Sequence, residues 1–399
     1  MIKKSTKLFL LMLLNIIFLN GCWDAREINE IGLVTAVGID IGEDTNRYLV
    51  TVQIANPSAD VSSSSSNNIK QAEWIVTGEG ESLFDATRKL VEISSRRIMW
   101  AHNNVIIIGE SLAKRGIIPV VDFFTHNPEL RMKASVVVSK GDAKKYVAAK
   151  AGFESPSGLS FILLEGYRAL HAESVESHML KVSSALKNEY TNLLISEISL
   201  KNAIIASKES DSKQSTSETI SLSGAAIFKK DKMLGWLSPE ETRGVSWILN
   251  ETSNTVVTVI DPEHGNKSVS VETSGVKAKF KTEVTNGIPK VWINVSGIGD
   301  IVEEDGSTKK SMSEVKQNTA KLIDQKIKDE IKNSLMVVQR KYMVDVLGFA
   351  AIVHIQNDRE WHNGLKDNWK EIFPEIPVSV SVNININSSK LNQEPYSIY

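Results

Sequence analysis

Two segments in which apolar and polar side chains strictly alternate place the strongest constraint on the fold. In residues 276–284 apolar side chains alternate with Lys and Glu, and the alternation returns in residues 291–295. Between them lies Asn286-Gly287, a dipeptide that favours the two-residue turn of a hairpin. A period of two places one set of side chains on a buried face and the other in water, as in an antiparallel sheet. The region is therefore predicted to be a β-hairpin with one buried face.

A long helix is predicted from Ser313 to about Val346. Its apolar face is formed by residues at helical spacing: Val315, Thr319, Leu322, Ile323, Ile327, Ile331, Leu335 and Val338. Thr319, Lys326 and Glu330 interrupt a strict heptad repeat. We therefore expect this helix to lie across the neighbouring sheet rather than in a coiled coil.

The rest of the chain mixes predicted strands and helices. Strands are predicted at residues 31–41, 48–55, 73–79, 104–108, 131–139, 193–206, 220–228, 233–237 and 378–386. Helices are predicted from Ser82, over 111–124 with Ser111 as N-cap, over 143–149, over most of 159–190, at 240–250 and around 361–369. The apolar segment 348–355 has the length of a strand.

These patterns predict a mixed α/β (α+β) fold with several domains. Mixed and antiparallel sheets would pack with helices, and the long helix would belong to the C-terminal domain. Hydrophobic residues make up 42% of the chain and charged residues 24%, which is typical of a folded globular protein. The expected divisions are a leader (1–21), a tether (22–30), an N-terminal α/β region (31–207, with subdomains 31–72 and 73–207), a polar linker (208–219) and a C-terminal α+β domain (220–399).

The N-terminal residues have the layout of a secretory signal peptide. Lys3, Lys4 and Lys7 precede an apolar segment, residues 8–19, and the small residue Gly21 follows. The apolar segment is about twelve residues long, whereas a helix needs roughly 20 to cross a bilayer. The leader is therefore predicted to be cleaved.

Cys22 is the only cysteine in the 399 residues. Together with Leu19 and Gly21 it resembles a bacterial lipobox, in which the thiol receives a diacylglyceryl group and the chain is cut just before it. The alternative is an ordinary secretion signal with an incidental cysteine. No cofactor is expected apart from the diacylglycerol thioether and an N-acyl chain, such as palmitate, on Cys22. Two acyl chains suffice for stable membrane attachment, whereas one is marginal.

No enzymatic chemistry is predicted. The sequence has no Gly-x-Ser-x-Gly elbow and no phosphate-binding loop of the Gly-x₄-Gly-Lys-Ser/Thr type. His171 and His178 are seven residues apart, unlike the i, i+4 pair of a zinc helix. His354 and His362 flank a junction between elements and are interpreted as one core and one surface residue. We therefore predict no catalytic residue and no metal site.

The net charge argues against nucleic acid as a partner. It is −2 for the whole chain, and residues 1–21 carry three Lys and no Asp or Glu, so cleavage would lower it to −5. A nucleic-acid-binding domain is typically basic.

Three sets of ordered motifs resemble the Ger(x)C family, the lipoprotein C subunits of nutrient germinant receptors in endospore-forming bacteria. The first set is Cys22-Trp23-Asp24-Ala25-Arg26-Glu27-Ile28 with Val37-Gly38-Ile39-Asp40. The second is Ser94-Ser95-Arg96-Arg97, Trp100-Ala101-His102, Gly109-Glu110, Gly116-Ile117, Asp122-Phe123, Pro128-Glu129 and Arg131. The third is Gly224, Phe228-Lys229, Lys232, Gly235-Trp236-Leu237-Ser238 and Glu241-Thr242-Arg243-Gly244.

The resemblance implies a non-enzymatic subunit of mixed α/β fold. It would be lipid-anchored through Cys22 to the outer face of the cell membrane, which in spores is the inner membrane. Its partners would be a polytopic B subunit and an A subunit of the receptor, and the nutrient would bind elsewhere in the complex.

Two polar-aromatic segments are candidate contacts for the partner subunits, because core packing alone does not explain them. The candidate residues are Arg96, Arg97, Trp100, Trp236 and Arg243. A solute-binding lipoprotein of a transporter is the alternative function. It requires a two-lobed α/β fold, which the antiparallel pattern after Thr255 fits poorly. A secreted hydrolase is disfavoured by the lack of a nucleophile motif.

Overall fold

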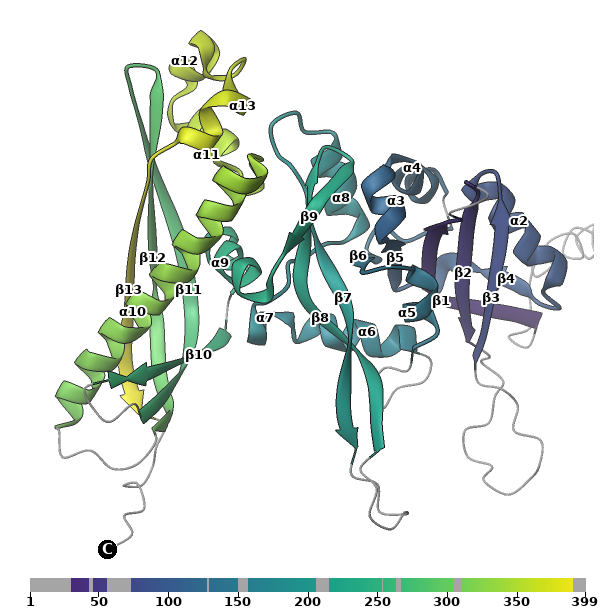
Figure 1. Cartoon of the computed structure of the whole chain (residues 1–399), viewed down its shortest axis with the longest axis horizontal. Coiled ribbons are helices and arrows are strands. Elements are labelled where there is room, and N and C mark those ends of the chain that lie inside the picture. Colours follow the sequence, from purple (N-terminus) through teal and green to yellow (C-terminus); the bar gives the residue numbers. More distant parts are fainter. Residues whose placement is uncertain are drawn as a thin grey trace, which may run out of the picture.

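The computed structural model describes residues 30–42, 46–55, 73–127, 129–149, 157–205, 215–252, 254–262, 267–304 and 311–389. Within these ranges the chain forms two sheets with packed helices, arranged along the longest axis of the molecule (Figure 1). The mixed α/β fold class with a long C-terminal helix is confirmed. Cys22 and the serine-rich residues 58–68 lie outside the described residues.

The first sheet combines a parallel centre with antiparallel ends. Its strand order is β3-β2-β1-β5-β6-β7-β8-β9, and β4 pairs with the beginning of β1. The pairs β1–β5, β5–β6 and β6–β7 are parallel, whereas the strands at both ends pair antiparallel. The strands are β1 Ile31–Ile41, β2 Tyr48–Ala55, β3 Glu73–Gly80, β4 Arg97–Met99, β5 Val105–Gly109, β6 Ser135–Ser139, β7 Leu194–Ile205, β8 Ser215–Lys229 and β9 Lys232–Leu237.

Helices cover both faces of the parallel centre, which explains why β5 and β6 are buried at every residue. Ile106 and Ile108 belong to one core with α2, α3, α4 and α8, and Val105 and Ile107 to another with α5 and α6. These helices and the short α7 are α2 Leu83–Ile93, α3 Glu110–Arg115, α4 Ile118–His126, α5 Ala143–Val147, α6 Ser157–Gly166, α7 Arg168–His171 and α8 Met179–Leu186.

The second sheet has the order β10-β11-β12-β13. The predicted hairpin is confirmed: β11 and β12 are antiparallel, and the turn residues Asn286 and Gly287 have φ of 52° and 75°. β13 pairs parallel to β12, because the helices between them carry the chain back to the same end of the sheet. The strands are β10 Asn254–Asp261, β11 Lys267–Thr285, β12 Ile288–Glu304 and β13 Val378–Ser389.

The long helix α10 (Met312–Met336) packs on this sheet and against α9 (Pro239–Leu249), as Figure 1 shows. A capping box of Ser311 and Glu314 starts it. The predicted apolar face is buried, with Ile323, Ile327 and Ile331 fully inaccessible to solvent. The prediction that α10 lies across the sheet is confirmed. The regular helix is shorter than predicted, because it changes at Val337 into the π-helical turn η4 (Val337–Tyr342).

Three local predictions are wrong. Helix α3 begins at Glu110 after Gly109, so Ser111 is not its N-cap. Strand β6 starts at Ser135, because residues 131–134 form turns that lead into it. Residues 349–356 form a helix, not a strand. This helix begins a group that we call the cap, composed of α11 Phe349–Gln356, α12 Asp358–Glu360, η5 Trp361–Leu365, α13 Trp369–Ile372 and η6 Phe373–Glu375.

A buried carboxylate explains why the cap begins with a helix. The Asp345 carboxylate accepts hydrogen bonds from the backbone N–H groups of Leu347 and Phe349 at 3.1 Å and of Ala350 at 2.7 Å. The indole of Trp369 donates a further bond of 3.2 Å. These bonds satisfy N–H groups that a helix start leaves without partners. Burial raises the pKa of Asp345 to about 6, although the four hydrogen bonds oppose this shift.

Residues 215–219 of the predicted linker belong to β8, where they pair with residues 201–205 of β7, and residues 208–214 lie outside the described residues. β8 continues into β9 through a turn at Lys230 and Asp231. The strands predicted at 220–228 and 233–237 are confirmed, and they pair as a hairpin in the first sheet. The divisions 31–207 and 220–399 separate strands of the same sheet, and as domain boundaries they stay a prediction.

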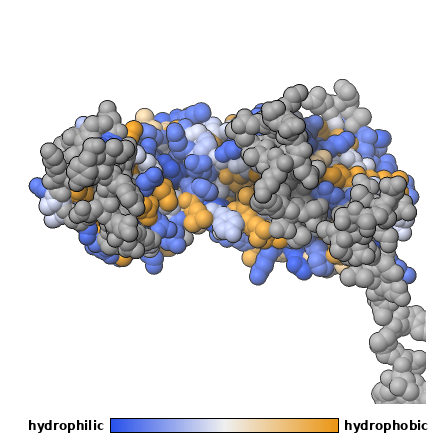
Figure 2. Space-filling view, turned by 90° about the horizontal axis from the view of Figure 1, so that it is seen from below, coloured by the Kyte–Doolittle hydropathy of each residue, from blue (hydrophilic) through white to orange (hydrophobic). Residues whose placement is uncertain are grey.

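Apolar side chains are exposed on the side of the molecule where α6 and α7 run. Figure 2 shows apolar surface gathered at the narrow middle of this face between hydrophilic flanks. In α6 and α7 and between them, four large side chains are between 44% and 60% exposed: Ile162, Leu163, Tyr167 and Leu170. Among the residues that the structure describes, none of the helices combines the length and the apolar character needed to cross a bilayer.

We predict that Asp345 makes the protein less stable as pH rises from about 4 to 6. Because the folded-state pKa of about 6 exceeds the ordinary value, the folded state keeps a proton there that the unfolded state has lost. Asp345→Asn removes this titration, so the shift of the urea midpoint from pH 4.5 to pH 7 should be less negative than in the unmodified chain. Equal shifts in both proteins would contradict the assignment.

Candidate partner-contact site

The predicted contact residues fall into two groups in different parts of the molecule. Arg96, Arg97 and Trp100 lie together near α2 and line one groove. Trp236 ends up at the contact between β9 and α3, and Arg243 lies between α9 and α10. The five residues therefore do not form a single surface.

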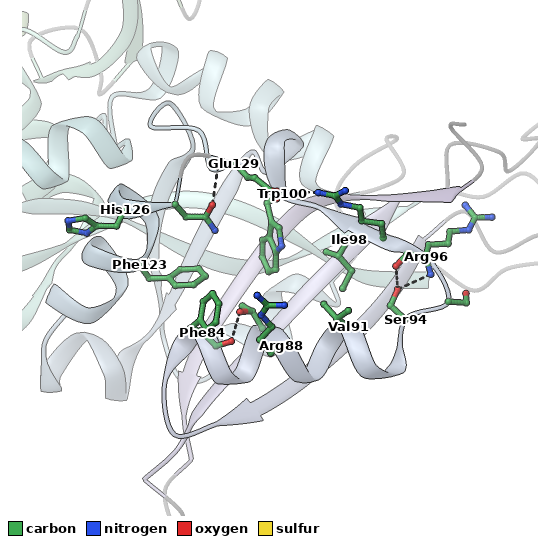
Figure 3. Close-up of a pocket in the computed structure, with 14 residues that line it drawn as sticks. Phe84, Arg88, Val91, Ser94, Arg96, Ile98, Trp100, Phe123, His126 and Glu129 are labelled. Atoms are coloured by element: carbon green, nitrogen blue, oxygen red, sulfur yellow. Dashed lines mark hydrogen bonds and ion pairs between the residues drawn. The ribbon is translucent and has the colours of Figure 1, made fainter. Parts of the chain in front are cut away.

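The groove has a volume of about 860 Å³ and is formed by α2, the turn after it, β4 and α4. Figure 3 shows Phe84, Arg88 and Val91 projecting from α2 toward Trp100 and toward Phe123 of α4. The full lining is Phe84, Thr87, Arg88, Val91, Ser94, Ser95, Arg96, Arg97, Ile98, Trp100, Phe123, His126, Asn127 and Glu129.

The local sequence explains how the turn before β4 is held. Ser82 caps α2 by accepting a hydrogen bond from the N–H of Asp85, and the helix ends at Ile93. The hydroxyl of Ser94 then donates to the carbonyl of Arg96 at 2.7 Å and accepts from its N–H at 3.3 Å. This closed turn fixes the backbone of Arg96 at the rim of the groove.

The groove presents positive charge beside apolar surface. Arg97 lies 3.6 Å from the carboxylate of Glu129, and both side chains are about half exposed. The guanidinium of Arg88 lies 4.9 Å from the ring centre of Phe84, a cation–π contact. Phe84 itself is 57% exposed, and an exposed aromatic beside arginines is typical of residues that dominate protein interfaces.

Trp100 forms the floor of the groove and belongs to the core. Only 8% of it is exposed, and it packs in the same core as Ile98 and Phe124. Any contact through this residue would therefore use the edge of its ring. The apolar residue that offers most surface here is Phe84, which the sequence motifs did not mark.

Trp236 holds β9 against α3. Its indole N–H donates to Glu110 at 3.4 Å, and Lys140 lies over its ring at 5.2 Å. Glu110 also binds Lys114 at 2.7 Å and the N–H of Gly141 at 3.2 Å. The bond from Lys114 is the main reason why the pKa of Glu110 is lowered. These contacts give Trp236 a role in the fold.

Arg243 forms a buried ion pair with Glu330 of α10. Its Nε donates to Oε2 at 3.1 Å and its Nη2 donates to Oε1, so the pair is bidentate. The indole of Trp247 adds a bond of 2.9 Å to Glu330, which is only 6% exposed. The next residue, Gly244, lets the helices approach: a Cβ there would lie 2.0 Å from Ser334 Oγ and 2.2 Å from the Glu330 carbonyl oxygen.

The sequence did not single out two buried carboxylates, Asp40 and Glu330, as structural residues. Asp40 is 4% exposed and accepts bonds from the N–H groups of Ala143 and Lys144 at 2.7 and 3.0 Å, so it caps α5 from a strand 103 residues earlier. Burial raises its pKa. The adjacent Asp142, the N-cap residue of α5, makes no such side-chain bond. The sequence signals were that Asp40 belongs to one of the family motifs and that Glu330 interrupts the heptad repeat of the long helix.

Two family models match consecutive parts of the chain. "Spore germination protein N-terminal domain" matches residues 24–200, and "Spore germination B3/ GerAC like, C-terminal" matches residues 223–390. The chain belongs to the Ger(x)C family of spore germination proteins.

Curated relatives match over nearly the whole length. Spore germination protein KC of Bacillus subtilis (strain 168) is 28% identical over 400 residues, which are 97% of each chain. Spore germination protein B3 of the same organism is 24% identical over 93% of this chain and 95% of its own. The crystal structure of the GerBC protein has the same fold, with a TM-score of 0.56, 21% identity, and coverage of 88% of this chain and 96% of that one.

Several motifs of the Ger(x)C family mark contacts inside this fold. Asp40 and Gly109 meet at α5, since a Cβ on Gly109 would lie 2.0 Å from the Asp40 carboxylate. Gly235 similarly faces the Tyr342 hydroxyl, which donates to the Trp236 carbonyl at 2.9 Å. The motif at Arg96 and Arg97 differs, because its guanidinium groups lie at an open groove.

We predict that two arginines contribute very differently to the free energy of unfolding. Arg243→Leu should lower the free energy of unfolding by about 3 kcal/mol, because it leaves the buried carboxylate of Glu330 with only the half-exposed Lys326, 3.9 Å away, as an ionic partner. Arg97→Leu removes only an exposed ion pair with Glu129 at the groove, so it should change this free energy by less than about 1 kcal/mol. Urea unfolding of the two purified variants measures both values. Similar losses in the two variants would contradict these roles.

Proposed function

We propose that the chain is the lipid-anchored C subunit of a nutrient germinant receptor of bacterial spores. The observation that carries this proposal is the match of both Ger(x)C family models, which together extend from residue 24 to residue 390. The relatives named spore germination proteins support it over the full length. In this role the subunit assembles with the polytopic B subunit and the A subunit, catalyses no reaction, and leaves nutrient binding to another part of the complex.

The anchor would be Cys22, which carries a diacylglycerol thioether and an N-acyl chain. The lipobox-like residues Leu19, Gly21 and Cys22 support this. Two acyl chains bury enough methylene groups for stable attachment. This attachment would place the protein on the outer face of the cell membrane, which is the inner membrane of the spore.

The anchor is close in the chain to a strand that pairs beside the groove. Eight residues separate Cys22 from Ile31, so this tether spans at most about 30 Å. Ile31 is the first residue of β1, and there it pairs with Arg97 of β4. A lipid on Cys22 therefore keeps the groove within reach of the membrane, where the polytopic subunits are.

We propose that the groove receives a segment of one of these membrane subunits. Arg88, Arg96 and Arg97 would meet acidic side chains or backbone carbonyls of the segment, and Phe84 would meet an apolar one. Trp236 and Arg243 are not part of this surface, because their contacts are within the fold.

Cys22→Ala should release the protein from membranes. Without the thiol no thioether forms, so the acyl chains that hold the protein are lost. Fractionation of sporulating cells, combined with labelling by a radioactive fatty acid, measures both effects. The variant should be soluble and unlabelled. Retention of an unlabelled variant in the membrane fraction at the native level would refute lipid anchoring.

Reversing the charge of the groove should slow nutrient germination several-fold. Arg96→Glu with Arg97→Glu replaces attraction to an acidic segment by repulsion. Arg97 is exposed and Arg96 is half-buried at the groove rim, so the melting temperature, measured on the same variant, should fall by no more than a few degrees. The assay is the loss of optical density of spores that depend on this receptor alone. The matched control is Lys321→Glu with Lys332→Glu on the exposed side of α10. Normal germination of the groove variant would rule out this surface.

A further inference from the structure

Three potential metal ligands converge in the cap, far from the groove along the molecule (Figure 1). They are His354 at the end of α11, Asp358 at the start of α12 and His362 in η5. Nε2 of His354 lies 3.2 Å from Oδ1 of Asp358, and Nδ1 of His362 lies 3.4 Å from the same oxygen. All three ligand atoms lie within 4.8 Å of one another. Neither histidine is a core residue, so the prediction of one core and one surface histidine is wrong.

These distances have the size of the edges of a tetrahedral coordination sphere. Zinc binds imidazole nitrogen and carboxylate oxygen at about 2.0–2.2 Å, so neighbouring ligand atoms of a tetrahedral site lie about 3.3 Å apart. Both distances to the Asp358 oxygen agree with that value. Only the two nitrogens need to approach each other, which small rotations of the side chains allow.

The surroundings hold the first ligand in place. The ring of His354 stacks on Trp361, with ring centres 5.3 Å apart and planes inclined by 22°. Trp361 is itself fully buried and has edge contacts with Trp369 and Tyr190. A buried aromatic support lowers the entropy that the imidazole loses when it binds an ion, which favours a preformed site.

We propose that His354, Asp358 and His362 bind one divalent transition-metal ion of the zinc type. Two imidazoles and one carboxylate suit zinc, whereas calcium and magnesium prefer oxygen ligands. A water molecule or another exchangeable ligand completes the fourth position, because Asp358 and His362 are exposed.

Binding changes one hydrogen bond of His362. Its Nδ1 also lies 2.9 Å from the backbone carbonyl oxygen of Asp358 and acts as a donor there when protonated. The ion needs the lone pair of this nitrogen, so the proton moves to Nε2. The side chain is 58% exposed, and water therefore satisfies the Nε2–H group.

The ion would connect two parts of the cap that are separated by a break in the helical backbone. Asn357 leaves the helical conformation, with φ of −138° and ψ of 58°, and thereby separates α11 from α12. A metal bound to residues on both sides of this break fixes the direction of α12 and η5 relative to α11. The site thus acts as a structural cross-link at the end of the C-terminal half of the molecule.

The test is calorimetric titration of the full chain, purified in detergent without a histidine tag, with Zn²⁺ and separately with Ca²⁺. We expect one Zn²⁺ per chain and no binding of Ca²⁺. Asp358→Asn and His362→Gln should each weaken Zn²⁺ binding at least tenfold. The matched control is His126→Gln, because Nδ1 of His126 makes the same 2.9 Å contact with the carbonyl of the residue four positions earlier, Asp122. That position belongs to no three-ligand group in the described part of the chain.

Melting temperatures separate the metal site from a role of these residues in folding. All variants should melt at the native temperature in chelator, and Zn²⁺ should raise the melting temperature of the unmodified chain and of His126→Gln only. The proposal is overturned if Zn²⁺ does not bind, or if it binds the Asp358→Asn and His362→Gln variants as tightly as the unmodified chain. These measurements need no germination assay, so they are independent of the proposed receptor role.

Discussion

The buried carboxylate of Glu330 lies at the contact between the two halves of the molecule, beside an apolar core to which both sheets contribute. It is buried in the middle of α10, where an ionised group without partners would be strongly unfavourable. Arg243 and Trp247 of α9 supply both its ionic partner and a further hydrogen bond. Because α9 directly follows β9 of the first sheet and α10 packs on the second sheet, this contact fixes one sheet relative to the other. Gly244 provides the close approach that the bonds require.

Two other buried carboxylates act on the same principle over long distances in the chain. Asp40 on β1 caps α5, and Asp345 caps α11 while it binds the indole of Trp369. In each case burial disfavours the charged form, and the N–H groups at a helix start compensate part of the cost. Several motifs of the Ger(x)C family lie at contacts inside the fold, such as Asp40 against Gly109 and Gly235 against Tyr342. The arginines at 96 and 97 stand apart, since they border a groove instead of filling a contact in the fold.

The surface features have a consistent order along the molecule. β1 is the first described strand after the proposed lipid site, and at its start it pairs with β4, which borders the groove. The cap with His354, Asp358 and His362 belongs to the opposite end in Figure 1. If the groove meets membrane subunits and the cap binds a metal ion, as proposed, the two halves of the molecule have separate tasks. The contact of Glu330 with Arg243 and Trp247 lies between these halves.

The sequence by itself determined the elements whose periodicity is strong. The hairpin at Asn286-Gly287 and the buried face of α10 follow from alternation and helical spacing, because these patterns reflect which side of an element is buried. The strands at 31–41 and 48–55 follow from apolar segments of strand length, and they are buried on both faces. The ordered motifs also sufficed to indicate the family. Tertiary structure alone decided that residues 349–356 form a helix, because its cap, Asp345, is held by packing against Trp369. It likewise decided that Arg243 is internal whereas Arg96 and Arg97 border a groove. An arginine has the same local sequence signature in both settings, and only the fold brings Arg243 against Glu330, 87 residues away.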